Sequence, residues 1–270
     1  MLLPYYIATL FGLAFGSFLN VCIARLPVDA SIVHPRSQCP LCRHTISTRD
    51  NVPILSWLLL RRRCRHCHGP ISVQYPLVEL ATAAWFALSL WRFDLSLAAV
   101  NCAALGFFLI GLLVMDWQTQ LLPDEFTLGG AAAGFALASV RAFLLPMDRG
   151  EVVLTGPERV LVYRTLAILI AALLLLIVRW GYRALRKRDG MGLGDVKMLA
   201  MIAAFLGLRQ ALLALFFAVI AAGLYAVALL LGRKATGQTR LPFGSFLAVG
   251  GMAAALFGIP LIAWYSGFYR

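Results

Sequence analysis

The stretch LIGLLVMDWQTQLLPDEFTLGG, residues 109–130, decides the class of fold. A long apolar run ends in a single acid, Asp116, and a short segment closed by Pro123 separates it from a second apolar run. A run of this length and apolarity is typical of a membrane-spanning helix. We therefore expect one spanning helix to end near Asp116 and the next to begin after Pro123, with Asp124 as its N-cap.

The composition of the whole chain indicates the same class. The 270 residues are 61% hydrophobic and 13% charged, with a mean hydropathy of +0.83, whereas about a quarter of the residues in soluble domains are charged. We predict an all-α polytopic membrane protein with about eight transmembrane helices. The apolar runs lie at roughly 2–24, 76–91, 95–115, 126–146, 160–178, 194–208, 210–231 and 243–264.

The basic residues predict the orientation of the chain. There are 24 Lys and Arg against 12 Asp and Glu, and most of the basic residues fall in 25–75, 179–197 and 233–240. With eight spans these stretches share one side of the membrane, which the positive-inside rule makes the cytoplasm. The excess of positive charge is therefore explained by the lipid bilayer as the partner, and we expect no binding of nucleic acid. We divide the chain into a first transmembrane helix (1–24), a cytoplasmic tetracysteine insert (25–75) and a transmembrane helical core (76–270).

The insert contains two C-x2-C pairs, Cys39 with Cys42 and Cys64 with Cys67. This pattern is typical of a structural zinc knuckle, in which four thiolates complete a tetrahedral shell and leave no open position for catalysis. Disulfides are not expected in the reducing cytoplasm. The alternatives are a metal-free pair of turns, a redox pair, or a histidine in place of one thiolate. All four histidines lie in the insert: His34, His44, His66 and His68.

Two acids stand at the ends of apolar runs. Asp116 ends the third run, and Asp195 opens the sixth within GMGLGDVKML, residues 190–199. Both are predicted at the cytoplasmic boundary, where ionisable groups are costly and commonly functional. Two carboxylates in a partly dry site share a proton, so one can activate water while the other polarises a peptide carbonyl. This is the chemistry of an aspartic protease.

The glycines before Asp195 leave two interpretations open. Glycine permits positive φ and close backbone approach, which an extended peptide substrate beside a catalytic acid would need. Alternatively, Gly194 and Asp195 form only a turn and the N-cap of the next helix. Lys197 either adjusts the acid pair or extends its amine toward water, and we favour the second.

Several ordered motifs together resemble the type IV prepilin peptidases, the bifunctional leader peptidases and N-methyltransferases of type IV pilus and type II secretion systems. The similarity runs nearly end to end. The motifs that carry it are GSFLNVCIARLP (16–27), RSQCPLCRHTISTRDNVPILSW (36–57), CRHC (64–67), ISVQYPLVELATA (71–83), DWQTQLLPDEFTL (116–128), GMGLGDVKMLA (190–200) and LPFGSFLA (241–248).

The resemblance implies an aspartyl endopeptidase of the bacterial inner membrane whose catalytic pair maps to Asp116 and Asp195. It implies cleavage of the basic leader of prepilins or pseudopilins after a glycine, on the cytoplasmic side. The new N-terminal residue, usually Phe, would then be methylated with S-adenosylmethionine, and the four cysteines mark this bifunctional branch. A leader peptidase without methyltransferase activity is the alternative. A non-catalytic zinc-knuckle scaffold or a transporter would belong to another class.

The sequence does not locate the S-adenosylmethionine site. Glu79 and Asn20 could line it, although structural contacts between helices explain them better. Two positions depart from the family's usual pattern. Arg63 stands where a glycine commonly precedes the third cysteine, and Ser245 stands where a proline is frequent.

Overall fold

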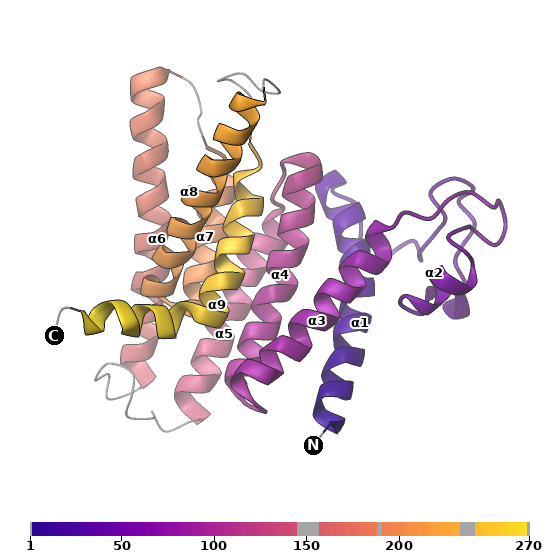
Figure 1. Cartoon of the computed structure of the whole chain (residues 1–270), viewed down its shortest axis with the longest axis horizontal. Helices are drawn as coiled ribbons and strands as arrows, with labels where there is room; N and C mark the ends of the chain where they lie inside the picture. Colours follow the sequence, from indigo (N-terminus) through magenta and orange to yellow (C-terminus); the bar gives the residue numbers. More distant parts are fainter. Residues whose placement is uncertain (1, 145–156, 188–190, 233–240, 269–270) are drawn as a thin grey trace. The chain divides into compact units, whose positions relative to one another are not determined.

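The computed structural model describes residues 2–144, 157–187, 191–232 and 241–268, and their fold is helical. Within these ranges the extended pairing is limited to two isolated bridges in the insert. The helices, drawn in Figure 1, are α1 (Leu3–Arg25), η1 (Leu26–Val28), η2 (Thr48–Asn51), α2 (Leu55–Leu59), α3 (Gln74–Phe93), α4 (Leu97–Thr119), α5 (Asp124–Leu144), α6 (Pro157–Arg186), α7 (Leu193–Leu206), α8 (Leu208–Leu231) and α9 (Phe243–Gly267).

Among the described residues, six helices are long and apolar enough to cross a membrane: α1 with η1, α4, α5, α6, α8 and α9. The prediction of an all-helical membrane protein is confirmed, but its count of eight spans is not. The two remaining long segments, α3 and α7, do not meet the same measure. With 14 residues, α7 is about 21 Å long, short of a hydrocarbon core of about 30 Å.

The chain forms two compact units, Met1–Gly111 and Leu112–Arg270, with the boundary inside α4. In the first unit, α1 and α3 pack with their backbones nearly in contact. A Cβ on Gly12 would lie 2.5 Å from the Cα of Ala83, and a Cβ on Gly16 would lie 2.7 Å from the Cα of Glu79. Such close packing through small residues is typical of membrane helices.

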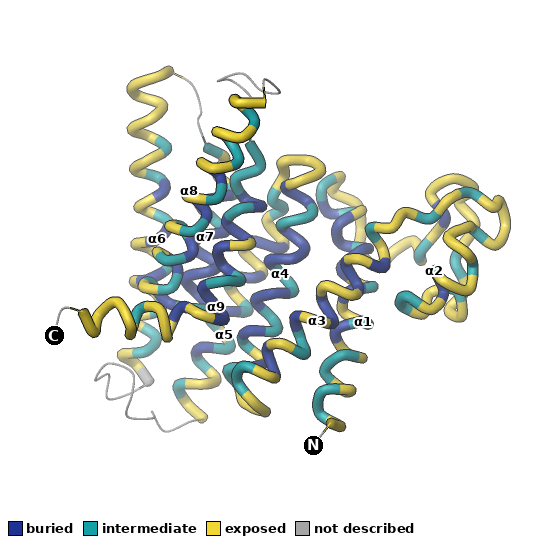
Figure 2. The backbone as a smooth tube through the Cα atoms, viewed as in Figure 1, coloured by how far each residue is buried: buried dark blue, intermediate teal, exposed yellow. Residues whose placement is uncertain are grey.

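The core of the second unit is α7, which is buried along most of its length, as the dark blue in Figure 2 shows. It packs against α5, α6, α8 and α9. A helix that is apolar all round is surrounded either by lipid or by other helices, which is why the sequence of α7 was predicted to be a span. Gly207 joins α7 to α8 without a loop and has a φ of 85°, a conformation that favours glycine.

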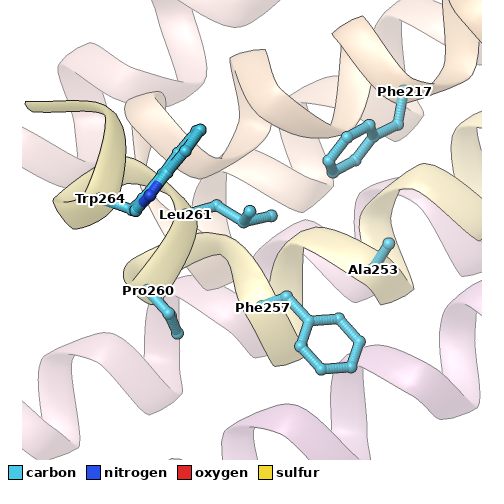
Figure 3. A pocket seen from close by; sticks show the side chains of 6 residues that line it. All are labelled: Phe217, Ala253, Phe257, Pro260, Leu261 and Trp264. Carbon is cyan, nitrogen blue, oxygen red and sulfur yellow. The ribbon is translucent and has the colours of Figure 1, made fainter. Parts of the chain in front are cut away.

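An apolar pocket of about 390 Å³ lies between α8 and α9 in the second unit (Figure 3). Pro260 lies inside α9 at this point, where it interrupts the hydrogen bonding of the helix. The lining carries no titratable side chain, so the pocket is not a candidate catalytic site. The lining residues are Phe217, Ala253, Phe257, Pro260, Leu261 and Trp264.

Candidate active site and metal centre

The first predicted acid, Asp116, lies in the last turn of α4 and is only 5% exposed. Its Oδ2 accepts a hydrogen bond from the backbone N–H of Ser245 at 2.6 Å and lies 2.9 Å from the Ser245 hydroxyl, which can donate a second. The same hydroxyl lies 3.1 Å from the carbonyl oxygen of Leu113. Ser245 is the third residue of α9, so the N-terminus of that helix holds one oxygen of the carboxylate.

The second predicted acid, Asp195, lies in the first turn of α7 and is 8% exposed. Gly192, the N-cap residue of α7, lies beside its carboxylate: a Cβ on Gly192 would lie 3.5 Å from Oδ2 of Asp195. The Asp195 carboxylate is also close enough to the Asp116 carboxylate for the two charges to interact. The structure therefore places both predicted acids in the second unit, buried and within range of each other's charge.

The neighbouring glycines make room for the loop between α4 and α5. A Cβ on Gly194 would lie 2.8 Å from the Cβ of Leu122. A Cβ on Gly244 would lie 3.0 Å from the Cγ of Asp116 and 3.0 Å from the Cδ1 of Leu122. Neither Gly192 nor Gly194 has a positive φ, so what these two positions use is the small size of glycine. Gly190 lies outside the described residues.

A charged pair flanks this site. The Nζ of Lys197, in the first turns of α7, donates to the Oδ1 of Asp124 at 2.6 Å. Asp124 is the first residue of α5 rather than its N-cap, and Lys197 binds it instead of only extending toward water. Because both side chains are part-exposed, the pair contributes at most about 1 kcal/mol. Its role is to connect the beginnings of α5 and α7.

The two candidate cofactor residues, Glu79 and Asn20, are buried in the first unit. The Oε2 of Glu79 accepts the backbone N–H of Ile54 at 2.7 Å. The Nδ2 of Asn20 donates to the carbonyl oxygen of Tyr75 at 3.0 Å, while its Oδ1 has no partner among the described residues. Glu79 is thus engaged by the protein itself, and the Asn20 oxygen is an open acceptor.

The four cysteines of the insert converge on one point. All four Sγ atoms lie within 4.8 Å of one another, and those of Cys39 and Cys67 are 3.8 Å apart. Four thiolates at about 2.3 Å from a tetrahedral zinc have Sγ atoms about 3.8 Å apart, so the arrangement fits this metal. The described histidines are not part of the group.

Each half of this cluster is a tight turn with the same hydrogen bonds. The N–H of Cys39 bonds to the carbonyl oxygen of His44, and the N–H of Cys64 bonds to that of Gly69. The N–H groups of Cys67 and His66 stabilise the Cys64 thiolate and lower its pKa to about 7. A thiol that ionises readily is suited to metal binding.

These features define a class: a multi-pass helical membrane protein with a buried pair of carboxylates at helix ends and a separate centre of four thiols. Comparison with known proteins gives the family. Residues 10–93 match the model of the bacterial peptidase A24 N-terminal domain, and residues 102–227 match that of the type IV leader peptidase family. The chain belongs to the type IV leader peptidase family, as its motifs predicted.

Three relatives show how far the similarity extends, and each is named prepilin leader peptidase/N-methyltransferase. The Myxococcus xanthus protein is 40% identical over 244 residues, which cover 87% of this chain and 67% of the relative. The Burkholderia pseudomallei protein is 36% identical over 294 residues, covering 96% and 87%. The Aeromonas hydrophila protein is 31% identical over 287 residues, covering 97% and 94%. No solved structure matches the chain.

The sequence did not identify every residue that contacts the acids. Ser245 was noticed only as a departure from the family pattern, yet it binds Asp116 directly. Gly244 and Leu122 drew no attention and also contact this site. The motif LPFGSFLA gave the available signal, but only the fold shows that it lies against the end of α4.

Proposed function

We propose that the protein is a prepilin leader peptidase and N-methyltransferase. It cuts the basic leader of prepilins or pseudopilins after a glycine and methylates the new N-terminal residue. The observation that carries the proposal is the pairing of two buried acids, Asp116 and Asp195, within the segment that matches the leader peptidase family. The names of the relatives support both activities.

In the peptidase reaction the two acids have complementary roles. Oδ2 of Asp116 accepts the Ser245 hydrogen bonds, so a proton shared by the pair is directed to Oδ1 of Asp116 or to Asp195. One carboxylate removes a proton from water while the oxygen of that water attacks the scissile carbonyl carbon. The partner carboxyl, which is protonated, donates its proton to the carbonyl oxygen. Collapse of the tetrahedral intermediate breaks the C–N bond. The leaving nitrogen takes the proton that the first carboxylate removed from water, and a hydroxyl of the intermediate returns a proton to the second acid as the carboxyl product forms.

The methyltransferase reaction needs S-adenosylmethionine, which supplies the methyl group for the new terminal amine. The open acceptor at Oδ1 of Asn20 could receive a hydrogen bond from an amino or hydroxyl group of this cofactor. Glu79 is the weaker candidate because its carboxylate already holds the Ile54 amide. We place no further residue in this site.

The cysteine cluster has a structural role in this account. Cys39, Cys42, Cys64 and Cys67 would hold one zinc ion, and four thiolates leave it no open position for a substrate or water. Since the insert has few buried apolar residues of its own, the metal would stabilise its fold.

We also propose that the protein lies in the inner membrane of a bacterium with the insert facing the cytoplasm, and that the acids share this side because α3 and α7 cross the membrane together with the six long helices. The Arg-rich composition of residues 25–75 supports this orientation through the positive-inside rule. The partners are then the bilayer and the prepilin. The apolar helix of the prepilin lies in the membrane while its basic leader stays in the cytoplasm.

The test is to incubate a prepilin with a Gly-Phe junction with membranes that contain this protein and S-adenosylmethionine. Mass spectrometry of the product should show loss of the leader and a gain of about 14 Da for one methyl group. Cleavage without the methyl group would favour the leader peptidase alternative. No cleavage by correctly inserted protein would favour a non-catalytic scaffold.

A further inference from the structure

The short α2 segment of the insert turns an apolar face outward. Val52, Leu55, Leu58 and Leu59 are between 43% and 73% exposed. Leu55, Leu58 and Leu59 lie in α2, where residues three and four positions apart share one face, and Val52 precedes the helix. We call these four residues the leucine face. The opposite side is fixed to the insert, since the hydroxyl of Ser56 accepts the Val52 N–H and donates to the carbonyl oxygen of Arg49.

The hydrogen bond from the Ile54 amide to Glu79 fixes the position of the leucine face along α1. The face begins beside the middle of α1, before its last residue, Arg25. Glu79 is level with Gly16, because a Cβ on Gly16 would lie 2.7 Å from the Cα of Glu79. Gly16 precedes Arg25, the last residue of α1, by nine positions, or about 14 Å along the helix. Since α1 is long and apolar enough to span a membrane, a bilayer that reaches Arg25 would also surround the protein at the level of Ile54 and Leu55.

Ile54 has an unusual backbone conformation at the start of α2. Ile54 has φ 59° and ψ −50°, and the N–H of Leu55 bonds to the carbonyl oxygen of Pro53 at 2.5 Å. This is a γ-turn with a positive φ, which is rare for a β-branched residue. A strained turn persists only where its surroundings hold it, and the bond to Glu79 at 2.7 Å does so.

Positive charge follows the leucine face directly. Arg61, Arg62 and Arg63 are all exposed, and the guanidinium of Arg62 lies 5.5 Å from the centre of the Trp57 ring. Leucines on one face followed by a cluster of arginines are typical of a segment that lies in the membrane interface. Anionic lipid headgroups attract such clusters.

We propose that residues 52–63 lie in the membrane interface, with the leucine face among the lipid acyl chains and the three arginines at anionic headgroups. The occupant of the leucine face is therefore lipid rather than a second copy of the chain or a protein partner. The insert is then fixed to the membrane at α2 as well as at its two ends. This inference goes beyond the proposed catalytic activity and does not depend on it.

The test uses the full-length protein in nanodiscs that hold one copy each and contain lipids with a quencher on the acyl chain. A fluorescent amino acid is placed at position 59, or at Leu41 as a matched control, since that leucine is 64% exposed in the same insert. We expect at least threefold stronger quenching at position 59 than at position 41. Equal quenching at the two positions, or none at position 59, would overturn the proposal, because the leucine face would then lie outside the acyl chains.

A second variant, checked for an intact fold, tests whether the leucine face is what holds the segment in the lipid. Leu55→Glu combined with Leu58→Glu should remove the extra quenching at position 59 while the rest of the insert stays resistant to protease. Replacing anionic by zwitterionic lipid should also reduce the quenching. If quenching at position 59 persists unchanged in the double variant, the leucine face does not hold the segment in the lipid and the proposal is wrong.

Discussion

A single methyl group at Gly244 should impair catalysis while the protein stays folded. In Gly244→Ala the new Cβ would lie 3.0 Å from the Cγ of Asp116, 3.1 Å from its Oδ2 and 3.0 Å from the Cδ1 of Leu122. Comfortable carbon contacts begin at about 3.5 Å, so the carboxyl group or the leucine must move by roughly half an ångström. Asp116 has little freedom to do so, because Ser245 holds its Oδ2 from the next position in the chain.

The magnitudes separate the two effects. Overpacking costs about 1–3 kcal/mol, and the better helix propensity of alanine returns up to about 1 kcal/mol. The free energy of unfolding should therefore fall by no more than about 3 kcal/mol. A displacement of about 1 Å at a reacting group can cost about 100-fold in rate. For half that displacement we expect kcat for leader cleavage to fall roughly 10-fold, with KM nearly unchanged.

The assay measures leader cleavage by purified enzyme in liposomes over a range of prepilin concentrations. Gly223→Ala is the matched control, because a Cβ at this position of α8 meets nothing within 4 Å. It should keep the wild-type kcat. Wild-type cleavage by Gly244→Ala, or equal losses in the two variants, would show that the contact with Asp116 does not matter for catalysis.

Three further predictions concern the hydrogen bonds of the acid pair and the stability of the insert. Ser245→Ala removes the hydroxyl near Asp116 but keeps the N–H, so kcat should fall about 10-fold, as expected for about 1.5 kcal/mol from one bond to a charged group; Ser245→Thr should restore most of it, and full activity in the alanine variant would contradict this. Zinc analysis should find one ion per chain and none in Cys39→Ser, whereas retained zinc would move the ligands to the histidines. The hydrogen bonds from Arg65 lower the pKa of Asp50 to about 2. The ion pair should therefore contribute fully to the stability of the insert above the ordinary carboxyl pKa, and this contribution should be lost as the pH falls through about 2. An NMR titration in which Asp50 takes up its proton near pH 4 would refute this prediction.

The sequence predicted the type of fold better than the number of spans. Composition and the long apolar runs were sufficient for an all-helical membrane protein. The apolar run at 194–208 was predicted to be a span, but it belongs to a 14-residue helix that other helices surround. Hydropathy responds to the absence of polar side chains and does not distinguish protein neighbours from lipid. Only the length of the helix could have indicated the difference.

The candidate site was predicted in part for a similar reason. The position of each acid at the end of an apolar run identified Asp116 and Asp195, and the cysteine spacing identified the cluster of four thiols. The contact from Ser245 joins residues 129 positions apart, which no local pattern reveals. One of the two interpretations of the glycines was room for a substrate backbone, and the structure shows Leu122 of the same chain against Gly194.

The most direct test of the central claim compares prepilin cleavage by the wild type, Asp116→Asn, Asp195→Asn and the double variant, each checked for membrane insertion. Residues that act as one catalytic unit are strongly non-additive. We therefore expect each single variant to lose as much activity as the double variant, to the limit of detection. If either single variant still cuts, that acid is only a cap or a boundary charge and the proposed pair is wrong.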